Sequence, residues 1–272
     1  MPYTSPFSVL KVEATGNDFL LIDLTDTPAL VTWNKEFGQR ARADLAREWC
    51  DRHFGLGADG LVILEQDPHL DFRWDFYNSD GSEAEMCGNA TRAVSLFFSQ
   101  KISKQQIEFN TRTGPVSAEV NSPNDIQVQL AAIAGFEWGL KTAQGQAYDF
   151  VSTGNPHAVV NVTNLQNKDV LKALALAVKA EPRFQQAGTN VTFVRQFNDS
   201  VIESQTFERG VEDFTLSCGT GAVAAAFSIL RGTEDQRMEV RVPGGTLFVI
   251  WKKGRPTLIG PAVLIAEMRL IR

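Results

Sequence analysis

Two short turns, each with a cysteine and a glycine directly before a helix-forming run, carry the side chains best suited to chemistry. The first turn spans residues 87–93 (CGNATRA), and the second spans residues 218–224 (CGTGAVA). A helix N-terminus has unpaired N–H groups and about half a positive charge, so it lowers the pKa of a nearby thiol and can hold an anion. Two such turns, separated by about half the chain, predict a duplicated module whose cysteines face each other across a cleft.

A pair of facing thiols, one ionised and one protonated, can invert a carbon acid. One thiol removes the proton from one face, and the other returns a proton from the opposite face. Backbone N–H groups after each cysteine would bind a carboxylate and stabilise the charge that develops as the α-hydrogen leaves. These residues are Gly88, Asn89, Gly219 and Thr220. This chemistry needs no pyridoxal cofactor, so we expect none; the alternative is two structural cysteines that lie near helix ends.

Two further stretches hold polar side chains that a plain loop would not need. His157 ends a rigid Gly-Asn-Pro-His segment before an apolar run, although a lone histidine is more often structural. Glu208 and Arg209 offer a carboxylate for an ammonium and a guanidinium fork for a carboxylate, with a surface ion pair as the alternative. Three asparagines in turns or at strand edges, which individually carry little weight, are Asn17, Asn78 and Asn190.

Composition narrows the class of protein. The chain has 272 residues, 43% of them hydrophobic, and a net charge of -6 with scattered Lys and Arg, which argues against binding to nucleic acid or to acidic membranes. No apolar stretch approaches the ~20 residues of a spanning helix, and the N-terminus lacks the features of a signal peptide. The three cysteines form neither a disulfide framework nor a metal site, and Cys50, next to Trp49, is predicted to be buried and structural. We therefore expect a cytoplasmic protein with reduced thiols and no bound metal.

The remaining patterns place these turns in two similar units of an α+β fold. Besides the helices after the two cysteines, helical periodicity predicts helices over residues 34–53 and 165–179, whereas residues 131–144 show no periodicity. Closely spaced strands favour mostly antiparallel sheets, each wrapped around a central helix, over a doubly wound parallel sheet. Strands are expected over residues 7–14, 19–23, 61–65, 72–77, 106–112, 116–120, 126–130, 150–153, 158–162, 191–196, 201–207, 238–242, 246–251 and 263–270.

Nearly end to end, the sequence resembles the diaminopimelate epimerase family, cofactor-independent enzymes that interconvert LL- and meso-diaminopimelate in lysine and peptidoglycan synthesis. The resemblance is specific because it includes both cysteine turns together with the Asn-Pro-His and Glu-Arg-Gly segments. The motifs that carry it are residues 16–19, 54–59, 78–82, 86–92, 154–157, 189–191, 208–210, 217–222 and 260–262.

The resemblance implies a role for each matched residue. Cys87 and Cys218 correspond to the two acid/base cysteines, while His157 and Glu208 correspond to groups that support catalysis around the reacting ammonium. The turns that hold the proximal carboxylate correspond to Gly88, Asn89, Gly219 and Thr220. The substrate contacts, several of them at the distal end, correspond to Asn17, Asn78, Asn155, Asn190, Glu208 and Arg209.

The family fold implies two pseudo-symmetric domains with the site between them, usually in a homodimer. We expect an N-terminal domain over residues 1–118, completed by residues 263–272, and a C-terminal domain over residues 119–262. The expected partners are a small-molecule amino acid and a second copy of the chain, with no nucleic acid and no membrane.

Three positions depart from the family pattern. Ala90 replaces a glycine and adds a Cβ that could tighten the carboxylate pocket or alter the turn, Ala93 replaces a second cysteine, and Phe214 replaces a frequent glutamate. None of them removes a principal catalytic residue. The alternatives are a racemase of another amino acid on the same fold, a non-catalytic amino-acid-binding relative, and a hydrolase that uses one cysteine with His157 and Asn155.

The two cysteines are not expected to be equivalent. His157, Glu208 and Arg209 all belong to the second half of the chain, so Cys218 should have the more polar surroundings. If both thiols approach one carbon atom, they should also be able to form a disulfide with Cys87 in the empty protein, and a reductant should reverse it.

Overall fold

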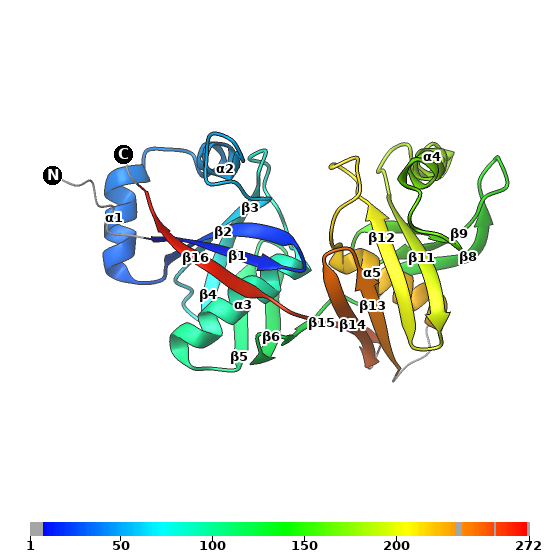
Figure 1. The fold of residues 1–272 in the computed structure, drawn as a ribbon. Coiled ribbons are helices and arrows are strands. Elements are labelled where there is room, and N and C mark those ends of the chain that lie inside the picture. The colour runs from blue at the N-terminus through cyan, green and yellow to red at the C-terminus, as the bar shows by residue number, and fades with distance from the viewer. Residues whose placement is uncertain (1–7, 232–235, 253, 271–272) are drawn as a thin grey trace. The chain divides into compact units, whose positions relative to one another are not determined.

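The computed structural model describes residues 8–231, 236–252 and 254–270, which form two compact units (Figure 1). Unit 1 comprises Met1–Val128 and Pro261–Arg272, and unit 2 comprises Gln129–Gly260. The chain therefore leaves unit 1 later than residue 118 and re-enters it slightly before residue 263. The reason is that the strand ending near residue 122 continues into a hairpin with the following strand, so both remain in unit 1.

Unit 1 is built on one sheet with the strand order β16-β1-β2-β3-β4-β5-β6-β7. Its described pairs are antiparallel except for β2–β3 and β4–β5, which are parallel. The strands are β1 (Ser8–Ala14), β2 (Asn17–Leu24), β3 (Gly60–Glu65), β4 (Phe72–Asn78), β5 (Gln106–Thr111), β6 (Gly114–Ser122), β7 (Asp125–Gln129) and β16 (Val263–Arg269). The predominance of antiparallel pairs agrees with the predicted fold class.

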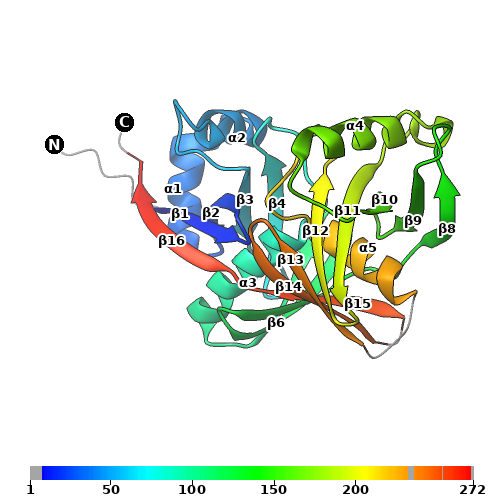
Figure 2. The ribbon, with the colours of Figure 1, turned by 45° about the vertical axis from the view of Figure 1, so that its right-hand side comes forward.

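Helices cover both faces of this sheet, because alternate residues of its strands point to opposite sides. Leu21 and Val62 pack in one buried cluster with α3 (Gly88–Ile102), whereas Leu20 and Leu61 pack in another with α1 (Thr27–Phe37) and α2 (Arg42–Cys50). Both ribbon views show α3 apart from α1 and α2 (Figures 1 and 2). The helix that follows Cys87 is thus held in a core of its own.

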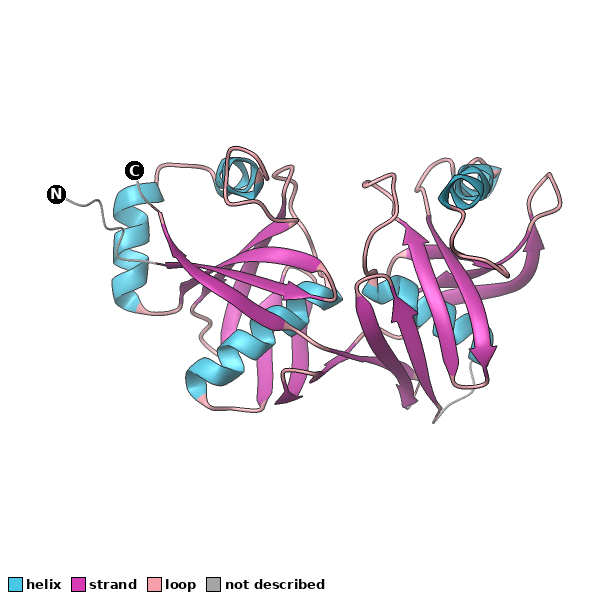
Figure 3. Cartoon of the chain, viewed as in Figure 1, coloured by secondary structure: helices cyan, strands magenta, loops and turns pink. Residues whose placement is uncertain are grey.

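Unit 2 has the strand order β15-β14-β13-β12-β11-β10-β9-β8, with parallel pairs only at β10–β11 and β12–β13 among those described. The strands are β8 (Gly135–Lys141), β9 (Ala147–Ser152), β10 (Pro156–Asn161), β11 (Asn190–Asn198), β12 (Val201–Phe207), β13 (Arg237–Val242), β14 (Gly245–Lys252) and β15 (Arg255–Gly260). Strands outnumber helices in each unit (Figure 3).

Two helices pack on opposite faces of the unit 2 sheet. The apolar helix α5 (Gly219–Leu230) is buried along almost its whole length. The amphipathic helix α4 (Lys168–Lys179) buries only Leu171, Ala175 and Val178, in a cluster with residues of β10, β11 and β12. A short 3₁₀ turn, Pro182–Phe184, follows α4. No helix in the described part of the chain is long and apolar enough to cross a membrane.

Three expectations from the sequence are wrong. The single helix over residues 34–53 is two helices, α1 and α2, because the chain turns at Gly38. The Phe37 and Trp49 rings pack edge-to-face across that turn, with centroids 5.2 Å apart. The spacing that predicted one helix therefore comes from residues of two separate helices. Residues 131–144 include the strand β8, and β15 was not expected at all.

Candidate active site

Cys87 stands at the start of α3, as the sequence predicted. Its backbone is extended (φ −140°, ψ 120°), and its carbonyl accepts the N–H of Thr91 at 2.8 Å. Gly88 and Asn89 form the buried first turn, in which backbone N–H groups have no acceptor within the helix. The thiol and the potential anion-binding groups therefore share the positive end of α3.

Asn17, at the start of β2, ties this helix end to the sheet. Its Oδ1 accepts from Asn89 Nδ2 at 3.2 Å and from the Cys87 thiol at 3.8 Å. Its Nδ2 donates to the carboxylate of Asp59 at 2.6 Å. Because a carboxylate only accepts, Asp59 fixes which end of the Asn17 amide faces the cysteine.

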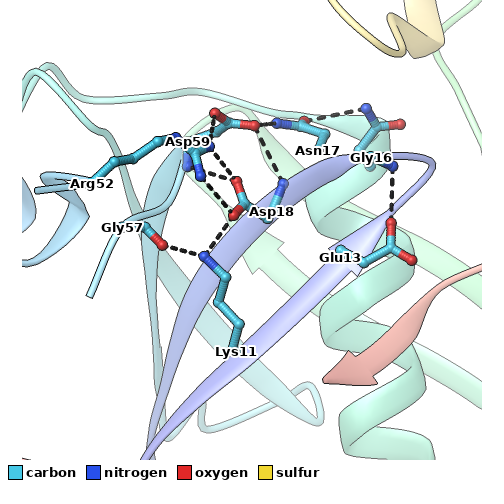
Figure 4. A network of polar contacts seen from close by, with 9 residues as sticks. Lys11, Glu13, Gly16, Asn17, Asp18, Arg52, Gly57 and Asp59 are labelled. Atoms are coloured by element: carbon cyan, nitrogen blue, oxygen red, sulfur yellow. Dashed lines mark hydrogen bonds and ion pairs between the residues drawn. The ribbon is translucent and has the colours of Figure 1, made fainter. Parts of the chain in front are cut away.

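A network of charged residues beside Asn17 holds Asp59 in place (Figure 4). Arg52 donates to Asp59 at 2.8 Å and to Asp18 at 2.7 Å, and Lys11 forms an ion pair with Asp18. Burial raises the pKa of Asp18, but the hydrogen bonds from Arg52 and Lys11 outweigh burial and hold that pKa at about 2. Sequence reasoning did not assign roles to these supports, although Asp18 and Asp59 stand inside two of the matched motifs.

Asn78 lies beside the same group of residues at the end of β4. It pairs with Gly60 of β3, and the next residue, Ser79, donates its N–H to the backbone carbonyl of Asp59 at 3.0 Å. The Asn78 side chain is exposed and donates to Ser82 Oγ at 2.9 Å. Thus the structure brings Asn17, Cys87 and Asn89 into direct contact. Asn78 is paired with Gly60, the residue that follows Asp59.

Cys218 begins α5 as Cys87 begins α3. Its backbone is extended (φ −121°, ψ 108°), and its carbonyl accepts the N–H of Ala222 at 2.9 Å. Gly219 and Thr220 follow as the first turn, and the Thr220 hydroxyl lies 3.5 Å from the Cys218 Sγ. The same hydroxyl lies 3.1 Å from His157 Nε2, so one threonine contacts both groups.

His157 is fully buried in β10 and is held by hydroxyls on both sides. Its Nδ1 is 2.9 Å from the Oγ1 of Thr192, which in turn is 3.1 Å from the Oγ1 of Thr206. Burial, reinforced by the positive charge of Arg209, lowers the pKa of His157 to about 3. The imidazole is therefore neutral near pH 7 and can relay a hydrogen bond but carries no charge.

Two of the predicted asparagines, Asn155 and Asn190, form a hydrogen-bonded group with Arg209 and this histidine. Asn190 Nδ2 lies 3.4 Å from His157 Nε2 and donates to the Pro156 carbonyl at 3.2 Å, while its Oδ1 accepts the N–H of Arg209 at 2.9 Å. The Arg209 guanidinium reaches Asn155 Oδ1 at 3.5 Å. These four predicted residues therefore form one polar cluster in unit 2.

Glu208 belongs to the loop that leads to Cys218. Its carboxylate accepts from the hydroxyl of Thr215, and its N–H donates to the Asp213 carbonyl at 3.0 Å. A bridge between Phe207 and Phe214 closes the loop. Glu208 is thus held by hydrogen bonds within its own loop.

Gly221 explains why α5 can approach the threonines so closely. A Cβ at this position would overlap with Thr206 Oγ1 and would lie 3.2 Å from Thr192 Oγ1. The corresponding residue of α3 is Ala90, which is helical and buried in the core of unit 1. Helix α3 thus accommodates the Cβ of Ala90 in its first turn.

The other two departures also have packing explanations. Ala93 is fully buried against the unit 1 core, where a small side chain fits. Phe214 packs edge-to-face on Phe207, with ring centroids 5.4 Å apart, and Lys168 lies over its face at 4.9 Å.

Cys50 is buried, and burial raises the pKa of its thiol to about 12, as expected for a structural cysteine. Across residues 8–231, 236–252 and 254–270, no three His, Cys, Asp or Glu side chains group as a metal site.

Solved structures with the same fold include racemases and epimerases. A hydroxyproline epimerase from Agrobacterium vitis superposes with a TM-score of 0.71 at 14% identity, covering 100% of this chain and 94% of that one. A probable proline racemase from Agrobacterium radiobacter K84 gives a TM-score of 0.70 at 15% identity, covering 97% of this chain and 92% of that one. The fold is therefore that of the class to which these amino-acid racemases and epimerases belong.

Sequence comparison is more specific. The model of the family described as diaminopimelate epimerase matches residues 9–133 and 150–265. The diaminopimelate epimerase of Aquifex aeolicus (strain VF5) is 41% identical over 229 residues, which is 82% of this chain and 81% of the relative. The diaminopimelate epimerase of Flavobacterium psychrophilum is 35% identical over 266 residues, 94% of this chain and 97% of the relative. The chain belongs to the diaminopimelate epimerase family.

Proposed function

We propose that this protein interconverts LL- and meso-diaminopimelate by moving the proton on one α-carbon between two cysteines. The observation that carries the proposal is that Cys87 and Cys218 each stand at the N-terminus of a buried helix, one in each unit. Family membership, with relatives named as diaminopimelate epimerases, supplies the substrate.

In the proposed reaction, one cysteine thiolate takes the α-proton while the other cysteine, as a thiol, gives a proton to the opposite face. One C–H bond of the α-carbon breaks and another forms on the opposite face. One thiolate becomes a thiol and one thiol becomes a thiolate, so the substrate is neither oxidised nor reduced. The first-turn N–H groups of α3 and α5 would hold the adjacent carboxylate, on which charge builds in the transition state. No pyridoxal cofactor is required.

The polar clusters would bind the rest of a two-headed amino acid. Arg209 offers a planar fork for a carboxylate, and Asn155 and Asn190 beside it offer amides for the attached ammonium and carboxylate groups. Asn17 and Asn78 would add contacts from unit 1, with Glu208 and His157 supporting the reacting end. By analogy with the family, we further propose a cytoplasmic homodimer, which sedimentation of the purified protein would test.

Solvent exchange is the direct test. LL-diaminopimelate incubated with the reduced protein in D₂O, without added pyridoxal phosphate, should gain deuterium at the α-carbon and appear as the meso isomer. Cys87→Ser and Cys218→Ser should each lower the epimerisation rate by about 10²–10⁴-fold, since each removes a proton-transfer group. Folded, reduced wild-type protein that exchanges no α-proton would exclude the proposal, and full activity in either variant would favour a one-cysteine hydrolase.

A second candidate is racemisation of another amino acid on the same fold. It is favoured by the structural likeness to a hydroxyproline epimerase and a proline racemase, which shows the fold only. A panel of L-amino acids, each offered in competition with LL-diaminopimelate, separates the two. Diaminopimelate should react fastest and suppress the others if the first proposal holds.

A further inference from the structure

His157 has polar neighbours at both of its ring nitrogens. Its Nδ1 faces Thr192 Oγ1 at 2.9 Å, and its Nε2 faces Thr220 Oγ1 at 3.1 Å and Asn190 Nδ2 at 3.4 Å. In the opposite ring orientation, carbon atoms would face these groups, so the neighbours fix the orientation of the ring. A threonine hydroxyl can donate or accept, and the two threonines alone therefore leave open which nitrogen carries the hydrogen.

The amide of Asn190 settles the direction of the hydrogen bonds. Its Oδ1 accepts the backbone N–H of Arg209 at 2.9 Å, and its Nδ2 donates to the backbone carbonyl of Pro156 at 3.2 Å. A backbone N–H only donates and a backbone carbonyl only accepts, so these two bonds fix which end of the amide faces His157. That end is the nitrogen, which has a second hydrogen to donate. An N–H at Nε2 would oppose it, so Nε2 is an acceptor.

An acceptor at Nε2 determines the state of the whole ring. A neutral imidazole carries one N–H and a protonated imidazole carries two, so the ring is neutral and its hydrogen is on Nδ1. Nδ1 then donates to Thr192 Oγ1, and Thr192 can donate its own O–H to Thr206 Oγ1, 3.1 Å away. Because His157 is 0% exposed, water cannot replace Thr192 as the acceptor for Nδ1–H, and an unsatisfied buried donor is unfavourable.

The sheet of unit 2 holds Thr192 in this place. In the register of the strands, His157 of β10 pairs with Asn190 of β11, and Thr192 of β11 pairs with Thr206 of β12. Residues two apart on a strand share a face, so Asn190 and Thr192 both lie on the side of His157. This is the face on which α5 packs, because a Cβ at Gly221 would lie close to both threonine hydroxyls.

We propose that Thr192 fixes His157 in the Nδ1–H tautomer and so keeps the lone pair of Nε2 toward the first turn of α5. In this tautomer Thr220 can donate its O–H to Nε2, whereas an N–H at Nε2 would turn that hydrogen away. The tautomer thus restricts the direction of the Thr220 hydroxyl, which lies 3.5 Å from Cys218 Sγ. Thr192 is a positioning residue, since it acts through His157. Its effect on catalysis rests on the proposed function, whereas the tautomer does not.

The first test measures the tautomer in the unsubstituted protein and needs no substrate. In protein labelled with ¹⁵N in its histidine rings, the NMR shifts of the two ring nitrogens distinguish a nitrogen that carries a hydrogen from one that does not. At pH 7, His157 should show a protonated Nδ1 and an unprotonated Nε2. The spectrum of His157→Gln, which lacks these signals, assigns them. A protonated Nε2 in the unsubstituted protein would overturn the proposal, whatever the epimerase assay shows.

Substitutions then test Thr192 itself. Thr192→Val keeps the shape of the side chain but removes the acceptor, so part of His157 should change to the Nε2–H tautomer. The kcat for epimerisation should fall by about tenfold or more, with a smaller change in KM. Thr192→Ser, which keeps the hydroxyl, should restore both the tautomer and the rate. Thr189→Val is the matched control, because it removes an equally buried hydroxyl that donates to the Pro156 and Asn190 carbonyls, and it should leave the tautomer unchanged.

The two measurements separate this inference from the proposed function. If Nε2–H appears in Thr192→Val but no form of the protein epimerises diaminopimelate, the role of Thr192 stands and the proposed function fails. A folded Thr192→Val in which His157 stays entirely Nδ1–H would overturn the role of Thr192, even with normal epimerase activity. If Thr192→Val does not fold, Thr192→Cys takes its place, since a thiol is only a weak acceptor. An unchanged tautomer in folded Thr192→Cys would overturn the proposal in the same way.

Discussion

Hydroxyl groups, and not charges, hold the only buried histidine of the described chain. His157 lies between Thr192 and Thr220, and its pKa of about 3 means that it does not titrate between pH 6 and 8. The pH–activity profile between pH 6 and 8 should therefore contain no titration step that is lost when His157 is replaced. A replacement that keeps a hydrogen-bonding side chain, such as His157→Gln, should lower the rate without moving the profile along the pH axis.

The same histidine makes the fold sensitive to acid. Its folded pKa of about 3 lies below the ordinary value of 6.5, so the unfolded chain binds the proton first as the pH falls. The contribution of neutral His157 to the free energy of unfolding is complete above pH 6.5 and is lost as the pH falls toward 3. At pH 5 the free energy of unfolding is lower by about 2 kcal/mol. Urea unfolding at pH 7 and pH 5 should show this loss in wild type and a smaller loss in His157→Gln. The exposed His69→Gln serves as control and should behave like wild type.

Residue types singled out many of the side chains that the structure brings together, but not the residues that support them. Cys87 and Cys218 were found because a cysteine and a glycine before a helical run form a local pattern. Asn17 became informative only when the structure placed it between Cys87 and Asp59. Thr192 had no sequence signal, since its contact with His157 comes from the pairing of β10 with β11.

At the scale of elements, the two cysteine helices both begin with a glycine but differ at their third residue, which is Ala90 in α3 and Gly221 in α5. Gly221 lets α5 lie against Thr206, whereas α3 accepts Ala90. Gly221→Ala should therefore destabilise the protein by about 1–3 kcal/mol and reduce activity, because the new Cβ overlaps with Thr206 Oγ1. Chemical denaturation measures the stability.

A double-mutant cycle supplies the control for Gly221→Ala. Thr206→Ala removes the nearest atom, so the double variant should be more stable than the sum of the two single changes predicts. Strict additivity would mean that close contact with Thr206 is not why glycine stands there.

Elements with a regular pattern were predictable, and those defined by their neighbours were not. The helix after Cys218 was expected and found, because its run of alanines and large apolar residues is unambiguous. In the strand β8, Phe136, Trp138 and Leu140 do alternate with other residues, but the strand is largely solvent-facing and contains two glycines, which weaken the strand signal. Its pairing with β9 determines it. The junction of α1 and α2 was hidden because aromatic rings from both helices share one core.

At the scale of the whole molecule, unit 1 is closed by β16, a strand from the far end of the sequence. β16 pairs with β1, and Pro261 just before it accepts a hydrogen bond from Arg92. Deleting residues 261–272 should therefore leave β1 as an unprotected edge, abolish activity and promote aggregation. Limited proteolysis should cut the truncated protein first within unit 1, while unit 2 keeps all of its own strands. Cleavage that starts equally in both units would contradict this view.

The late arrival of β16 also determines when the first half of the site can form during synthesis. Residues 8–128 leave the ribosome well before β16 is synthesised, so the pairing of β1 is complete only after β16 has emerged. Domains usually fold in order from the N-terminus as they emerge. Here unit 2 has all of its strands first, so the cysteine that is translated second should reach its native surroundings before the cysteine that is translated first.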